Sequence, residues 1–159
     1  MRTPALLALF LSACGGARPA PEPVGPSADS SASSASPASV PADADPRRDP
    51  SFRVAASKGG SFTLAWRPVA GALPRNERCE LELFLYRGEE PLSGAQLSVS
   101  GWMPDHGHGM LVQPQAFETG AGRYLVTGVL LHMRGSWVLF FDVISGAYSE
   151  RAEFALEVK

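Results

Sequence analysis

The chain has 159 residues and a formal net charge of −2, from 14 Lys and Arg against 16 Asp and Glu. The pair Arg47-Arg48 is too small a basic patch to bind nucleic acid or lipid headgroups, so we do not expect nucleic acid as a partner. No serine or cysteine nucleophile motif is visible in the sequence, and we therefore predict that the protein is not an enzyme.

Residues 1–13 are typical of an export signal, with a positive charge at Arg2 and a short apolar run over residues 5–11. That run is too short to span a bilayer as a helix. Residues 11–14 read LSAC and resemble the bacterial lipobox, in which the cysteine is lipidated and becomes the mature N-terminus. We expect Cys14 to anchor the protein by lipid in the cell envelope, facing the periplasm or the cell surface. A plain cleaved signal peptide is the alternative.

The segment 14–50 is rich in Ala, Pro, Ser and Asp and has almost no large apolar side chain. A segment of this kind does not bury enough surface to offset the entropy lost on ordering. The sequence therefore predicts a disordered linker between Cys14 and a domain that covers residues 51–159.

Residues 51–159 carry the signature of β-structure. Apolar and polar side chains alternate in several stretches, which is the period of a strand with one buried face. The clearest apolar sets are Cys79, Leu81, Leu83 and Leu85; Trp137, Leu139, Phe141 and Val143; and Phe154, Leu156 and Val158. Further strands are expected at residues 61–66, 96–102 and 123–130. Short strands separated by glycine-containing turns predict an all-β, immunoglobulin-like antiparallel sandwich of about seven strands.

The sequence predicts no intrachain disulfide. Once Cys14 is lipidated, only Cys79 remains, so no intrachain pair can form. Cys79 lies on the apolar face of its predicted strand, where a free thiol packs as a small hydrophobic group. Metal ligation is the alternative for this residue.

Histidine and methionine are concentrated at two places. The first is the glycine-containing stretch 103–110, and the second is a His-Met pair that follows an apolar run. Imidazole and thioether together suit copper, whereas Mg²⁺ and Ca²⁺ prefer oxygen ligands. The predicted copper ligands are Met103, His106, His108, Met110, His132 and Met133. We expect the two places to converge at one end of the sandwich, because loops gather there.

A structural interpretation is available for each candidate ligand. Methionine packs into irregular gaps in a core, and glycine-rich turns often carry surface histidines without a role. Adjacent side chains of a strand point to opposite faces, so His132 and Met133 would not both face one ion unless the following turn begins early. We therefore expect one of these two residues not to be a ligand.

The ordered motifs resemble those of the YtkA-like (FixH-like) domains of bacterial envelope proteins. Residues 103–110 match their Met-Pro element and His-, Gly- and Met-rich loop, Gly122-Arg123-Tyr124 matches their Gly-x-Tyr strand, and residues 133–137 match their Met-x-Gly-x-Trp element. The resemblance covers roughly residues 78–158. It implies an immunoglobulin-like sandwich and, for some members, a role in copper handling or cytochrome oxidase assembly.

A weaker resemblance is to periplasmic copper chaperones of the PCu(A)C type, which use Met and His ligands separated by a long spacer. Met110 and His132 resemble that arrangement. However, His132 and Met133 are adjacent rather than a His-x-Met pair, and Val99 stands where that family has a histidine.

Two functions from different classes follow. The first is a copper chaperone or sensor module that works with a copper-accepting protein. The alternative is an interaction or accessory module that binds another envelope protein without metal. If the isolated protein does not bind copper, the copper chaperone or sensor function is rejected.

Overall fold

The computed structural model describes residues 45–159, which form strands and turns without a helix. The expected export signal 1–13, the lipidation site Cys14 and the linker up to residue 44 lie outside the described residues. Within the described part, no helix is long and apolar enough to cross a membrane.

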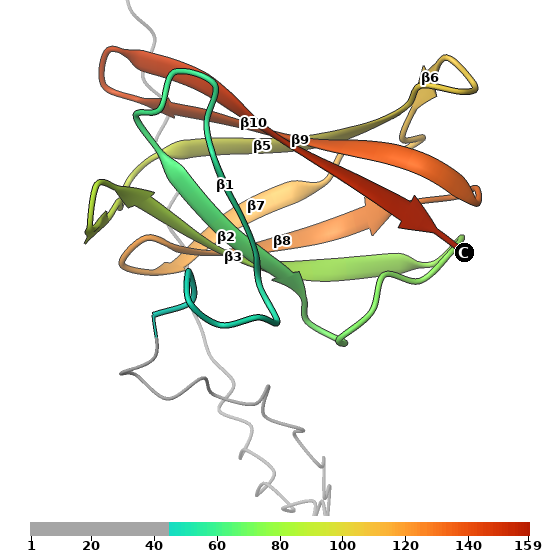
Figure 1. The fold of residues 1–159 in the computed structure, drawn as a ribbon, viewed down its shortest axis with the longest axis horizontal. Helices are drawn as coiled ribbons and strands as arrows, with labels where there is room; N and C mark the ends of the chain where they lie inside the picture. The colour runs from blue at the N-terminus through green and yellow to red at the C-terminus, as the bar shows by residue number, and fades with distance from the viewer. Residues whose placement is uncertain (1–44) are drawn as a thin grey trace, which may run out of the picture. The chain divides into compact units, whose positions relative to one another are not determined.

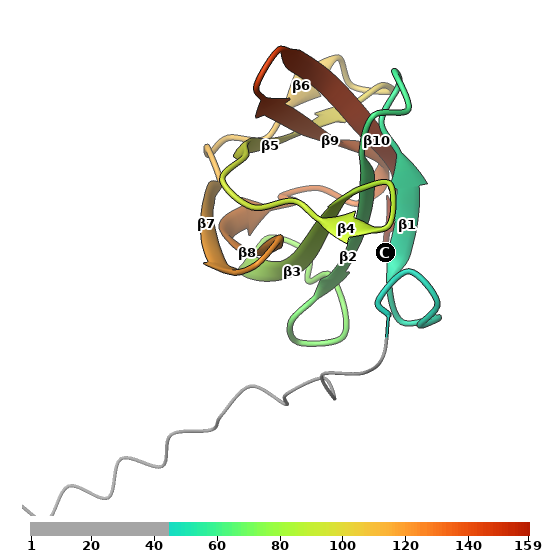
Figure 2. The ribbon, with the colours of Figure 1, turned by 90° about the vertical axis from the view of Figure 1, so that its left-hand side faces the viewer.

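Two antiparallel sheets pack face to face (Figures 1 and 2). The first sheet has the order β1-β2-β3-β8-β7, and a short strand β4 also pairs with β3. Its strands are β1 (Arg53–Ala56), β2 (Thr63–Pro68), β3 (Arg78–Arg87), β4 (Glu90–Pro91), β7 (Gln115–Gly120) and β8 (Arg123–Leu130). The second sheet has the order β10-β9-β5-β6. Its strands are β5 (Gln96–Met103), β6 (His108–Gly109), β9 (Gly135–Ser145) and β10 (Tyr148–Val158).

The core lies between the sheets and is made by the alternating apolar residues. The apolar sets of β3, β9 and β10 are all buried. At the centre, the Trp66 and Phe154 rings pack edge to face at 5.7 Å, and the Phe141 and Phe154 rings do so at 5.4 Å. Packed aromatic pairs of this geometry stabilise a core beyond the area they bury. The predicted antiparallel sandwich is therefore confirmed.

Residues 45–159 contain ten strands, where about seven were expected. Strands β4 and β6 have only two residues each. Strands β1 and β7 lie at the edges of their sheet, and most of their side chains are exposed. Without a buried face they lack the apolar alternation on which the sequence prediction relied.

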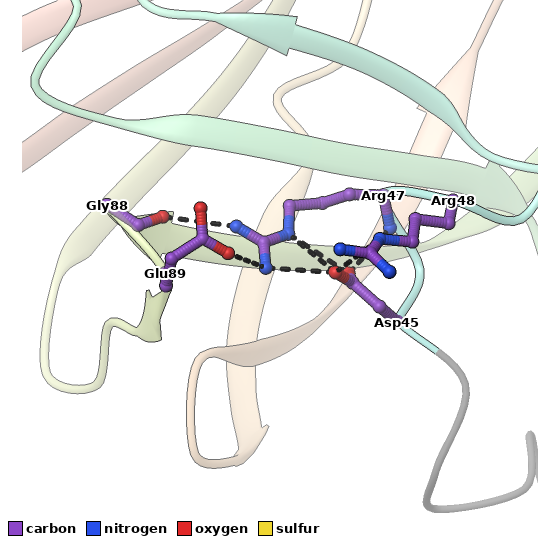
Figure 3. Close-up of polar contacts among 5 residues, drawn as sticks. All are labelled: Asp45, Arg47, Arg48, Gly88 and Glu89. Atoms are coloured by element: carbon purple, nitrogen blue, oxygen red, sulfur yellow. Dashed lines mark hydrogen bonds and ion pairs between the residues drawn. The ribbon is translucent and has the colours of Figure 1, made fainter.

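Residues 45–50 form turns and pack against the sandwich, although the sequence places them in the linker. The guanidinium of Arg47 donates hydrogen bonds to the Asp45 carboxylate, the Gly88 carbonyl and the Glu89 carboxylate (Figure 3). The same group lies 4.3 Å from the centroid of the Tyr86 ring. Residues 45–50 have few apolar side chains, so composition predicted a linker. They are ordered because the Arg47 side chain binds them to the domain.

A carboxylate ties the start of β10 to the turn between β1 and β2. Glu150 accepts hydrogen bonds from the Ser57 hydroxyl at 2.5 Å, from the Ser61 hydroxyl, and from the Ser61 amide at 3.2 Å. A Cβ atom added at Gly59 would lie 2.5 Å from this carboxylate. The turn therefore fits closely around the ionised group.

We expect Glu150→Ala to lower the melting temperature at neutral pH by a few degrees. The hydrogen bonds from Ser57 and Ser61 lower the pKa of Glu150 below its ordinary value of 4.5. A lowered folded-state pKa contributes stability above the unfolded pKa, and this contribution is lost as the pH falls through the folded value. The gap in melting temperature between wild type and variant should therefore be smaller at an acidic pH well below 4.5 than at neutral pH.

The matched control is Glu77→Ala, since Glu77 is an exposed carboxylate in the loop before β3. Thermal melts of the three proteins at both pH values test the prediction. An equal gap at both pH values would show that the Glu150 carboxylate is not the stabilising group.

Candidate metal centre

The three histidines of the chain gather at one end of the sandwich. His108 lies in β6 and is the antiparallel partner of Met103 in β5. His106 lies in the turn between β5 and β6, and His132 lies in the connection between β8 and β9. Figure 1 shows β6 and the start of β9 at the same end of the molecule. The expected convergence of the two segments is thus present in the fold.

His108 is the common neighbour of the other two imidazoles. Its ring centroid is 5.1 Å from that of His132 and 5.8 Å from that of His106. In a histidine complex of a first-row metal the bonding nitrogen lies about 2.0–2.1 Å from the ion, which places the ring centre roughly 3 Å away. Two rings on one ion at a tetrahedral angle then have centroids about 5 Å apart. The spacing of His108 and His132 fits a shared ion.

The turn between β5 and β6 explains why His108 faces inward. The amide of Gly107 donates to the carbonyl of Met103 at 2.9 Å, and Gly107 adopts a φ of 69°. This left-handed conformation is open to glycine at little steric cost. The closed turn sets the register of Met103 opposite His108, and partners in a ladder carry their side chains on the same face. His108 therefore shares the inner face with the buried Met103.

The imidazoles of His108 and His132 are half-buried, and each has a nitrogen available for a metal. Nδ1 of His108 lies 3.2 Å from the Gly109 carbonyl, so a proton on Nδ1 is stabilised there and the lone pair of Nε2 stays free. Nδ1 of His132 is buried and has no hydrogen-bond partner among residues 45–159. A proton on this atom would be a buried, unsatisfied donor, which favours the tautomer that leaves its lone pair free.

The methionines differ in position. Met103 is fully buried. Met110 occupies the space beside Gly101, because a Cβ atom added there would lie 3.2 Å from the Met110 methyl group. Met133 is partly buried against the core. Each sulfur thus has a packing role, and Met103 is the one paired directly with a histidine.

Nitrogen and oxygen donors do not complete a site by themselves. Among residues 45–159, no three His, Cys, Asp or Glu side chains converge as a set that could hold a metal ion. Asp105 is exposed. Cys79 lies in β3, and burial raises the pKa of its thiol to about 11, so the thiol stays protonated at neutral pH. We call His106, His108 and His132 the histidine cluster. A metal at this cluster would need sulfur from methionine to complete its ligands.

Trp137 is the neighbour that sequence reasoning assigned only to the core. Its ring is fully buried and packs edge to face against His132 at 5.4 Å and His108 at 6.2 Å. The Met-x-Gly-x-Trp element contained the signal, because it places this ring a few residues after His132.

The YtkA-like family model matches residues 55–139, which is more than half of the chain. The chain belongs to the YtkA-like family. No match was found among the curated proteins.

Three solved structures are similar to this YtkA-like chain. A DUF4426 family protein of Pseudomonas aeruginosa is 12% identical with a TM-score of 0.50, and the match covers 68% of this chain and 94% of that one. FetP of uropathogenic Escherichia coli is 10% identical with a TM-score of 0.47, covering 67% and 95%. A copper-bound variant of FetP is 9% identical with a TM-score of 0.44, covering 67% and 94%. At 12% identity, the first likeness concerns the fold alone.

Proposed function

We propose that this YtkA-like domain binds copper at the histidine cluster and serves as a chaperone or sensor module of a lipid-anchored envelope protein. The observation that carries the proposal is the 5.1 Å separation of the His108 and His132 rings, which come from segments far apart in the sequence. A surface turn with incidental histidines has no reason to meet a third histidine from another connection.

The donor set fits copper better than other common metals. His108 and His132 would hold the ion through free ring nitrogens, with His106 at the exposed rim and the sulfur of Met103 on the inner side. Soft thioether and imidazole donors select Cu(I), while hard cations select oxygen. When bound, Cu(I) would supply a soft, one-electron-oxidisable centre, and this chain's residues would hold it and limit its access to water.

A copper competition titration tests the proposal. We expect the full-length protein to take Cu(I) from a chromophoric chelator. The double variant His108→Gln/His132→Gln should lose at least about 100-fold in affinity, since losing even a residue that only orients a ligand costs about 10–100-fold and this variant lacks two ligands. The control is Asp105→Asn, which removes the carboxylate of the same turn and should leave Cu(I) affinity unchanged. No Cu(I) uptake by the wild-type protein would reject the proposal.

One observation favours the alternative function, a protein-interaction module without metal. Trp102 is 41% exposed and Leu111 is 74% exposed. Trp102 pairs with Gly109 on the strands that carry the cluster. Exposed large apolar side chains at one place are typical of interaction sites. Absence of copper binding together with capture of an envelope partner that Trp102→Ala abolishes would support this function instead.

We propose that lipid on Cys14 is what holds the protein at the membrane. The sequence offers a lipobox at this position, and lipid chains supply membrane affinity. Cys14→Ser should therefore move the protein from the membrane fraction to the soluble fraction, as judged by fractionation and immunoblotting. Retention of the variant in membranes after a salt wash would contradict lipid anchoring.

A further inference from the structure

Trp137 contacts the histidine cluster in two independent ways. Its indole Nε1–H donates a hydrogen bond to the carbonyl of Met133 at 3.0 Å, which lies in the connection that carries His132. Its ring also packs edge to face against both His132 and His108, with centroid distances of 5.4 Å and 6.2 Å. No other side chain in the part of the chain that the structure describes is shown in ring contact with both imidazoles.

We infer that Trp137 is a positioning residue that sets the geometry of the histidine pair, beyond its role in filling the core. The inference rests on the proposed copper function for its effect on affinity. Its effect on the histidine rings is a property of the metal-free protein and does not depend on copper.

The hydrogen bond provides the first part of the physical reason. The connection between β8 and β9 spans only residues 131–134, and the Met133 carbonyl is held by the indole at its end. Without this donor, the carbonyl loses a buried partner and the connection is free to relax toward water. His132 belongs to the same connection and would move with it.

The ring packing provides the second part. A rigid, fully buried indole presents a fixed surface, so two imidazoles packed against it are limited in rotation. Ligands held in place before the ion arrives bind it more tightly, because less conformational freedom is lost on binding. Trp137 would thus act on copper through His108 and His132 without touching the ion.

Trp66 provides a matched control within the same core. It is also fully buried, and it packs against Phe141 and Phe154 rather than against histidine. Its indole Nε1 has no hydrogen-bond partner within residues 45–159. Trp66→Phe therefore removes the same atoms as Trp137→Phe but breaks no donor contact to a loop.

The experiment compares full-length wild type, Trp137→Phe and Trp66→Phe. In the metal-free proteins, long-range ¹H–¹⁵N spectra of the imidazoles should show shifted His108 and His132 signals for Trp137→Phe and unchanged signals for Trp66→Phe. In a Cu(I) competition titration, Trp137→Phe should lose about 10–100-fold in affinity, as for other residues that orient metal ligands. Trp66→Phe should stay within about twofold of wild type.

The outcomes separate the two ideas. If wild type takes up no Cu(I), the proposed function fails, and the imidazole spectra still decide the role of Trp137. Equal imidazole spectra and equal Cu(I) affinity in the two folded variants would overturn the inference. If Trp137→Phe does not fold, NOE contacts from the Trp137 indole to both His108 and His132 in metal-free wild type take its place. Their presence supports the inference and their absence overturns it.

Discussion

Trp137→Ala is expected to lower the free energy of unfolding by about 3–5 kcal/mol, the cost of removing a fully buried aromatic side chain and leaving a cavity. The Trp137 ring is 0% exposed, and its removal also leaves the Met133 carbonyl without its indole donor. For a domain of this size the change corresponds to a fall of roughly 10–20 °C in melting temperature. Denaturant unfolding followed by circular dichroism gives the free energy of unfolding, and thermal melts give the melting temperature.

Trp102→Ala is the control for that experiment. Trp102 is 41% exposed, whereas Trp137 is fully buried, so the loss of Trp102 should cost clearly less than the loss of Trp137. Similar losses for the two variants would mean that burial between the sheets does not decide the contribution of a tryptophan here, and that the assigned strand faces are wrong.

Replacement of Met103 and Met110 by leucine is expected to weaken Cu(I) binding far more than Cu(II) binding. Leucine has a volume similar to that of methionine, so neither replacement leaves a large cavity. This matters because Met103 is fully buried and Met110 fills the space beside Gly101. Thioether sulfur is a good donor for Cu(I) and a poor one for Cu(II), whereas neutral imidazole serves both. The Cu(I) affinity should fall by about tenfold or more and the Cu(II) affinity by less than about threefold.

Replacement of His106 and His108 by glutamine should instead weaken both oxidation states. Acid should do the same to the wild-type protein, because a proton competes with the metal for the ring nitrogen. Competition titrations with Cu(I)- and Cu(II)-specific chelators distinguish these effects. Equal losses for both oxidation states in the methionine variant would show that sulfur is not a ligand.

The fold class and the strands that make the core could be predicted from the sequence alone. Alternation in β3, β9 and β10 identified their buried faces correctly, because a strand buried on one side must repeat apolar residues at every second position. The residue types near β6 also pointed to a soft metal from donor chemistry alone. Both inferences depend on local composition, which folding does not change.

The edge strands and the first residues of the ordered domain could not be predicted from the sequence and were identified only in the tertiary structure. Strands β1 and β7 lie at sheet edges. Most of their side chains are exposed, so apolar and polar residues do not alternate along them. Residues 45–50 are held by contacts of Arg47 with a turn about 40 positions away, as its hydrogen bond to Gly88 spans 41 positions. Such contacts leave no periodic signal in either segment.

The geometry of the candidate site depends on the packing of the two sheets. His108 and His132 are distant in the sequence, and their 5.1 Å ring separation arises because β6 and the β8–β9 connection meet at one end of the sandwich. Both residues were predicted as ligands from the sequence. However, their separation along the chain does not determine the distance between their side chains in the folded protein. The contacts of Trp137 with both rings are likewise tertiary. They depend on how β9, β6 and the β8–β9 connection are placed relative to one another, which local residue preferences do not encode.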